Sequence, residues 1–136
     1  MSLRNFGLQL DSFVNAVKEA HTENVRSVAQ VAITEVVGFT PVDTSQARTN
    51  WVPTLNSPFL GTVPFAEGHR GSTAGAAFTA TQRAMSLVRN QCRFGDSIYI
   101  RNNVPYIEEL EAGKSSQAPS GMLKLTVQAI DMDLKR

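Results

Sequence analysis

The sequence predicts an α+β fold, in which a long N-terminal helix and further helices pack on a small, mainly antiparallel sheet. Three observations predict it. Apolar residues recur at three- and four-residue steps over Leu10–Val36, which is the pattern of an amphipathic helix. A second helical pattern covers Ala76–Arg89. Short runs rich in β-branched and aromatic residues, bounded by turn residues, predict strands at Asn50–Leu55 and Ile98–Arg101.

Length and composition indicate one ordinary folded domain. The 136 residues suit a single domain over 1–136, with 18% charged and 42% apolar residues. A net charge of +1 gives no global attraction to nucleic acid. The single cysteine, Cys92, excludes an internal disulfide and fits a protein made in a reducing cytoplasm. Neither a signal peptide nor an apolar run near the ~20 residues of a membrane helix is visible, so we expect no membrane partner.

The first helix is expected over Asp11–Val37, with Asp11 or Ser12 as its N-cap and Gly38 at its end. At the usual rise per residue it reaches ~40 Å, which is about the span of the domain. Its apolar stripe either covers the sheet along the whole length or lies partly against a neighbouring subunit.

An extended connection follows, because Pro41 keeps the residue before it out of helical space. Asp43 or Thr44 is expected to cap a short turn that runs through Arg48. An ion pair between Asp43 and Arg48 and separate solvation of the two charges both fit this spacing. The lone Trp51 is predicted to anchor the core, the alternative being a binding hot spot.

The segment Asn56–Ala77 is predicted to be a flexible loop, because it is rich in glycine and proline, and part of Asn56–Phe65 is a candidate third strand. Aromatic residues accompany the glycines, which favours a loop that orders on a partner. The glycines lack the ending of a phosphate-binding loop, so no nucleotide site is expected. The candidate contact residues are Phe59, Phe65, Glu67, His69 and Arg70.

The stretch from Ile98 to Met122 is predicted to hold an exposed loop in place for contact with a partner. A strand is broken at Asn102-Asn103, Pro105 is placed at the first position of a short helix, and Gly113 is placed to close it. A polar loop follows, with Lys114, Ser115 and Ser116 as further candidate contact residues. The last segment, Met122–Leu134, fits a helix better than the alternative strand.

Candidate chemistry is weak, and we expect neither an enzyme nor a cofactor or metal site. His69 and Glu67 supply only two ligands, which is too few for zinc. Cys92 lies in no nucleophile context, and the most common role of such a residue is a small buried apolar one. The grouped Glu108, Glu109 and Glu111 are predicted to form the solvated side of their helix. Four arginines make the region around the second helix mildly basic, namely Arg83, Arg89, Arg93 and Arg101.

Two motifs together resemble a known family. The first reads Pro41-Val42-Asp43-Thr44, then Arg48 and Asn50-Trp51; the second reads NNVPYIEELE, then G, S, QAP and GM. The pair, over residues 5 to 130, is similar to the tail-completion or head–tail joining proteins of long-tailed bacteriophages. That group includes the HK97-type joining protein and is similar to minor tail protein Z of lambda. Ser45 stands where the family often has glycine. The motif residues are Pro41, Asp43, Thr44, Arg48, Trp51, Asn103, Pro105, Tyr106, Glu109, Gly113, Gln117, Pro119 and Gly121.

The resemblance implies a structural virion protein, assembled in the host cytoplasm and located in the phage neck. Copies, commonly six, would form a homo-oligomeric ring that completes the tail and joins it to the head connector. Neighbouring connector and tail-tube or terminator proteins are the implied partners, and genomic DNA would pass through the lumen without sequence recognition. A tail terminator, a head-closure protein and a small nucleic-acid-binding protein are the alternatives.

Overall fold

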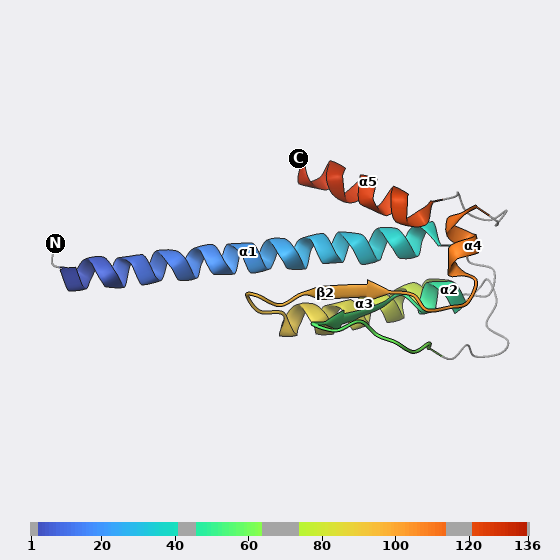
Figure 1. Cartoon of the computed structure of the whole chain (residues 1–136), viewed down its shortest axis with the longest axis horizontal. Helices are drawn as coiled ribbons and strands as arrows, with labels where there is room; N and C mark the ends of the chain where they lie inside the picture. The colour runs from blue at the N-terminus through green and yellow to red at the C-terminus, as the bar shows by residue number, and fades with distance from the viewer. Residues whose placement is uncertain (1–2, 41–45, 64–73, 114–120, 136) are drawn as a thin grey trace.

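The computed structural model describes residues 3–40, 46–63, 74–113 and 121–135. The elements along the chain are α1 (Leu3–Phe39), α2 (Gln46–Thr49), β1 (Val52–Leu55), α3 (Ala74–Gln91), β2 (Ile98–Arg101), α4 (Ile107–Glu111) and α5 (Met122–Leu134). The long α1 runs the length of the molecule, with α5 along one side and the sheet and α3 on the other (Figure 1). This confirms the predicted α+β class.

The sheet consists of β1 and β2 in antiparallel pairing. Val52 lies opposite Arg101 and Leu55 lies opposite Ile98. The expected third strand is absent from residues 56–63, because Asn56 takes a left-handed φ of 64° that turns the chain out of the sheet. In the described part of the chain each strand therefore has a neighbour on one side alone.

Helix α1 is longer than predicted at both ends. It begins at Leu3 and passes through Gly38 to Phe39, so Asp11 and Ser12 lie inside it and cap nothing. No proline interrupts the first ten residues, and each of the two helical glycines, Gly7 and Gly38, costs only ~1 kcal/mol. At 1.5 Å per residue the 37 residues reach ~55 Å.

Helix α5 confirms the helical interpretation of the last segment and shows the strand alternative to be wrong. Met122 and Thr126 are its buried residues, and their four-residue separation is that of one helix face. The Thr126 hydroxyl donates to the carbonyl of Met122 at 2.7 Å. A strand would have buried Leu123 and Val127 together, yet both are exposed.

Helix α4 begins at Ile107, two residues later than predicted, because Pro105 belongs to the turn before it. The N–H of Ile107 donates to the carbonyl of Val104 at 3.2 Å, which places Pro105 at the second position of a four-residue turn that suits its fixed φ. Gly113 follows the C-cap with a φ of 91° and confirms the predicted terminating glycine.

The core lies along the C-terminal half of α1, between α5 on one side and α3 with the sheet on the other. Met85 of α3 and Met122 of α5 pack with the C-terminal half of α1 and with Trp51. Cys92 is buried, as predicted for a small apolar residue. The cluster consists of Ala29, Ile33, Val36, Val37, Trp51, Met85, Val88 and Met122.

Candidate functional site

The two sequence motifs meet at the end of the molecule where α2 and α4 lie (Figure 1). The hydroxyl of Tyr106 donates to Oε1 of Gln46 at 2.9 Å. The side-chain amide of Asn102 donates to the carbonyl of Ala47 at 2.7 Å. These bonds tie the segment after β2 to α2, although the two segments are far apart in sequence.

Arg48 donates hydrogen bonds to backbone carbonyls at the C-terminal end of α1. Its Nε donates to the carbonyl of Thr40 at 2.8 Å and its Nη2 donates to the carbonyl of Gly38 at 3.3 Å. The last carbonyls of a helix lack partners within the helix and carry partial negative charge, so a cation there stabilises the end. Burial lowers the pKa of Arg48 from its ordinary value. Its predicted partner Asp43 lies outside the described residues.

Trp51 is a core residue, as predicted, with 4% of its surface exposed. Its indole N–H donates to the hydroxyl oxygen of Thr40 at 2.8 Å, and that hydroxyl donates to the carbonyl of Val36 at 2.5 Å. Thr40 is itself buried. The tryptophan is therefore held to the end of α1 by a buried chain of hydrogen bonds.

Asn103 fixes the described part of the candidate contact loop. Its side-chain amide donates to the carbonyls of Phe59 and Gly61, each at 2.8 Å. Its Oδ1 accepts a hydrogen bond from Nε of Arg101 at 2.7 Å. Phe59 is half-buried, whereas the neighbouring Leu60 is 78% exposed. The loop thus begins as an anchored segment that presents an apolar side chain to solvent.

Glu111 has a role that the sequence did not reveal. We expected it on the solvated side of its helix, but its carboxylate accepts the backbone N–H of Leu123 at 2.9 Å. Its carbonyl also accepts the N–H of Gly121 at 2.8 Å. Gly121 is the N-cap of α5 in a left-handed conformation and has no side chain to cap with. Glu111 therefore supplies the missing cap from α4. Glu109 is exposed, as predicted.

Several predicted site residues lie in segments between the described ranges. Those outside the described residues are Pro41, Asp43, Thr44, Phe65, Glu67, His69, Arg70, Lys114, Ser115, Ser116, Gln117 and Pro119.

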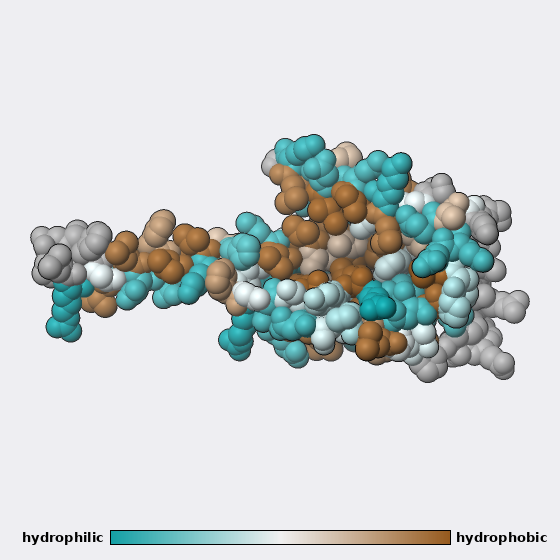
Figure 2. Space-filling view, in the orientation of Figure 1, coloured by the Kyte–Doolittle hydropathy of each residue, from teal (hydrophilic) through white to brown (hydrophobic). Residues whose placement is uncertain are grey.

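The N-terminal half of α1 projects beyond the rest of the molecule as a single helix (Figure 1). Leu10 is 46% exposed, Phe13 66%, Val14 45% and Val17 52%. We call these four residues the α1 stripe. Figure 2 shows hydrophobic surface along the projecting half and again over α5 and the adjoining part of α1. A lone helix with an apolar stripe needs a partner to bury it, since helical stability in proteins comes mostly from packing.

The total surface is large for the mass. The chain exposes 8765 Å², whereas a compact monomer of 14.8 kDa exposes ~7,000 Å². The difference of ~1,800 Å² is about the area that a protein gives to two standard contacts with neighbours.

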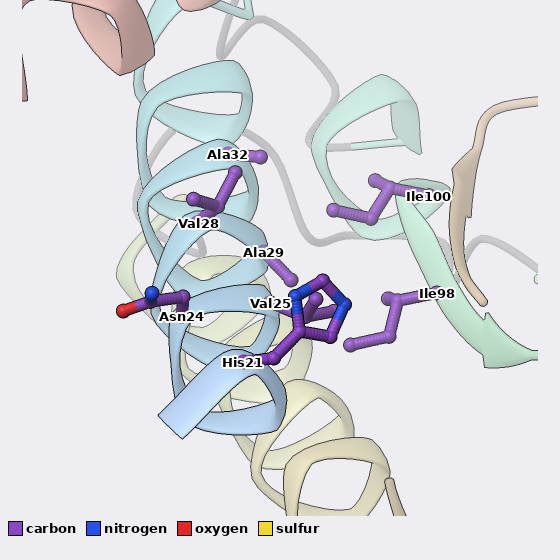
Figure 3. A pocket seen from close by; sticks show the side chains of 8 residues that line it. All are labelled: His21, Asn24, Val25, Val28, Ala29, Ala32, Ile98 and Ile100. Carbon is purple, nitrogen blue, oxygen red and sulfur yellow. The ribbon is translucent and has the colours of Figure 1, made fainter. Parts of the chain in front are cut away.

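An apolar groove of about 430 Å³ runs between α1 and β2. We call it the α1–β2 groove. Its α1 wall includes Val25, Val28 and Ala32, and its β2 wall consists of Ile98 and Ile100 (Figure 3). His21 and Asn24 lie at its end nearer the projecting half. Small residues on the α1 side leave room for a side chain or a helix from elsewhere.

The basic region is partly neutralised. Nη2 of Arg89 lies 3.7 Å from the carboxylate of Glu23, and Nη1 of Arg89 donates to Oε1 of Gln30 at 3.5 Å. Nε of Arg101 is bonded to Asn103. Arg83 and Arg93 are exposed. The four arginines therefore do not form one free cationic surface.

The loop before β2 is held by Asp96. The backbone N–H of Arg93 donates to its Oδ2 at 2.8 Å and the side-chain amide of Asn56 donates to its Oδ1 at 3.0 Å. These two bonds to the charged form lower the pKa of the Asp96 carboxyl. The arrangement joins the end of β1 to the start of β2 and is structural.

Within the described ranges, no three His, Cys, Asp or Glu side chains gather closely enough to hold a metal ion. The helices of those ranges also include none that is both long and apolar enough to cross a membrane. Comparisons with protein-family models, with curated proteins and with solved structures gave no match.

Proposed function

We propose that the protein is a structural subunit of the neck of a long-tailed bacteriophage. In this proposal several copies, commonly six in such necks, form a ring that completes the tail and joins it to the head connector. The protein acts by binding its neighbours and performs no catalysis. It is assembled in the host cytoplasm and resides in the virion at the top of the tail.

The observation that carries the proposal is the projecting half of α1. The α1 stripe has no partner within the described chain, and its four residues are between 45% and 66% exposed. Apolar surface of this kind on a separate helix is typical of a subunit that is completed by its neighbours.

Two further features support an assembly role. Among the described residues, each strand of the sheet has an open edge, which neighbouring subunits can cover by adding a strand. The resemblance to head–tail joining proteins rests on two motifs, and hydrogen bonds from Tyr106 to Gln46 and from Asn102 to Ala47 join the segments that carry them. Asn103 of the second motif holds the start of the candidate contact loop, so the motif residues have a defined structural purpose in this proposal.

The charge distribution suits a ring through which DNA passes. A net charge of +1 avoids the strong phosphate attraction that would retard DNA during ejection. The pairing of Arg89 with Glu23 counts against the alternative of a nucleic-acid-binding protein, because that surface is already partly neutralised.

The test is electron microscopy of particles made by a phage that carries an amber codon in this gene. The proposal predicts full heads beside separate tails of complete length, and a plasmid copy of the gene restores joined particles. Tails of uncontrolled length would assign the protein to the terminator position, and heads that lose their DNA would assign it to head closure. Normal, infectious particles would contradict every structural version of the proposal.

A further inference from the structure

The apolar positions on one face of α1 repeat with an 11-residue period. The spacing from Leu10 through Val14 and Val17 to His21 recurs from His21 through Val25 and Val28 to Ala32. An 11-residue period of 3.67 residues per turn nearly matches the straight α-helix, so these positions form one nearly straight line. The first half of the line belongs to the α1 stripe, and the second half belongs to the α1–β2 groove.

This line is self-complementary when a second copy is turned end to end. We propose that two copies of the protein pair through α1 in antiparallel orientation, about a two-fold axis that passes beside His21. Each α1 stripe then lies in the α1–β2 groove of the other copy. Leu10 comes opposite Ala32 of the second copy, and Val14 comes opposite its Val28. The larger residue of the projecting half thus faces the smallest residue of the groove.

The face contains no formal charge that would oppose self-pairing. None of the seven line positions is Asp, Glu, Lys or Arg, and the flanking Phe13 and Asn24 are also uncharged. Asp11 and Lys18 flank the line on its other side, and in the antiparallel pair Asp11 comes opposite Val31 and Lys18 opposite Asn24, so no like charges face each other. Like charges across an interface are costly, so their absence favours a second copy as the occupant.

The exposed area is sufficient for such a pair. A standard interface removes ~800 Å² from each partner, which is less than half of the ~1,800 Å² by which this chain exceeds a compact monomer. The line from Leu10 to Ala32 is ~33 Å long, so the contact includes six helical turns.

The pair goes beyond the proposed function and does not depend on it. A ring that joins a head on one side to a tail on the other has two different sides. A two-fold axis in the plane of the ring would make those two sides identical. The pairing therefore belongs to the free protein, where it covers apolar surface until assembly. Ring formation would require the pair to separate.

Single-cysteine variants test the pairing directly. His21→Cys should cross-link to itself with a short bis-maleimide, because the axis passes beside it. Val14→Cys and Val28→Cys should each fail alone, since in either variant the two copies of the residue lie ~21 Å apart. A mixture of Val14→Cys and Val28→Cys should cross-link. The wild type, whose Cys92 is buried, is the background control.

The other patterns would overturn the proposal. Self-cross-linking of Val14→Cys would indicate parallel helices. Cross-linking in the Val14→Cys and Val28→Cys mixture without any in His21→Cys would indicate a head-to-tail contact, as in a ring. No cross-linking in any sample would show that a second copy does not cover the α1 stripe. The neck proposal would still be tested separately, by the morphology of the particles.

Sedimentation provides an independent measurement. The wild type should sediment as a dimer, and Val14→Asp should raise the dissociation constant about a hundredfold or more, because each pair would bury two carboxylates without partners. Asn15→Asp adds the same charge one residue further on, on another face of the helix, and should leave the dimer intact. Equal effects of the two substitutions would contradict the pairing. Circular dichroism checks that both variants remain folded.

Discussion

Replacing Thr40 by valine isolates the buried hydrogen bond that holds Trp51. Valine keeps the shape of threonine and removes the hydroxyl that accepts the indole N–H at 2.8 Å. Thr40 is 1% exposed and Trp51 is 4% exposed, so water cannot replace the lost partner. The substitution therefore leaves a buried donor unpaired without creating a large cavity.

The expected loss follows from that unpaired donor. An unsatisfied buried donor costs ~1–3 kcal/mol, and we expect the free energy of unfolding to fall by ~2 kcal/mol. For a domain of this size each kcal/mol lowers the Tm by ~3–5 °C, so the Tm should fall by ~6–10 °C. Thr40→Ser keeps the hydroxyl and loses one methyl group, which costs ~1 kcal/mol.

Urea denaturation followed by tryptophan fluorescence measures the effect, because Trp51 is the only tryptophan of the chain. All variants are compared at one protein concentration, since association would add to the apparent stability. In a Trp51→Phe background, followed by circular dichroism, Thr40→Val should cost much less, because the indole donor is gone. The reasoning is refuted if Thr40→Val is no more destabilising than Thr40→Ser.

Three further substitutions test the contacts around the motif network. Glu111→Ala should lower the free energy of unfolding by ~1 kcal/mol and speed amide exchange in the first turn of α5, because the N–H of Leu123 loses its acceptor; exchange confined to other helices would contradict this. Because the pKa of Asp96 is lowered in the folded state, its ionised carboxylate stabilises the fold at pH values above the ordinary pKa of 3.8, and this stabilisation is lost as the pH falls through the folded-state pKa. Asp96→Asn should therefore flatten the acid side of the plot of unfolding free energy against pH, and an unchanged plot would count against this role. Asn103→Ala should release the segment at Phe59 and increase its cleavage in limited proteolysis, whereas cleavage at the wild-type rate would show that other contacts hold it.

Local patterns in the sequence predicted the elements whose causes are local. The three- and four-residue spacing predicted α1, α3 and α5, and the position of Gly113 predicted the end of α4 because only a residue tolerant of positive φ suits that place. Trp51 was predicted to be buried on general grounds of size and apolarity.

The extent of α1 was not predicted, because capping residues are ambiguous in an exposed helix. Asp11 and Ser12 are good N-cap residues, but on a projecting helix they can equally face solvent inside the helix. The longer apolar line, extending to Leu10 and beyond, was the available signal.

Contacts through space were not predictable from spacing. The cap that Glu111 supplies to α5 joins two helices separated by a loop, and the bonds from Asn103 to Phe59 and Gly61 cross more than forty residues. No periodicity encodes such pairs. The α1–β2 groove arises in the same way, from the packing of β2 against a helix distant in sequence.

The most direct measurement of the central claim, that the α1 stripe is an assembly surface, is complementation of the amber-mutant phage by plasmid-borne variants. Val14→Asp should fold like the wild type yet fail to restore joined, infectious particles, because a charge on the stripe opposes its burial against a neighbour. Asn15→Asp, with the same charge on another face, should restore the wild-type titre. Full restoration by Val14→Asp would contradict the account.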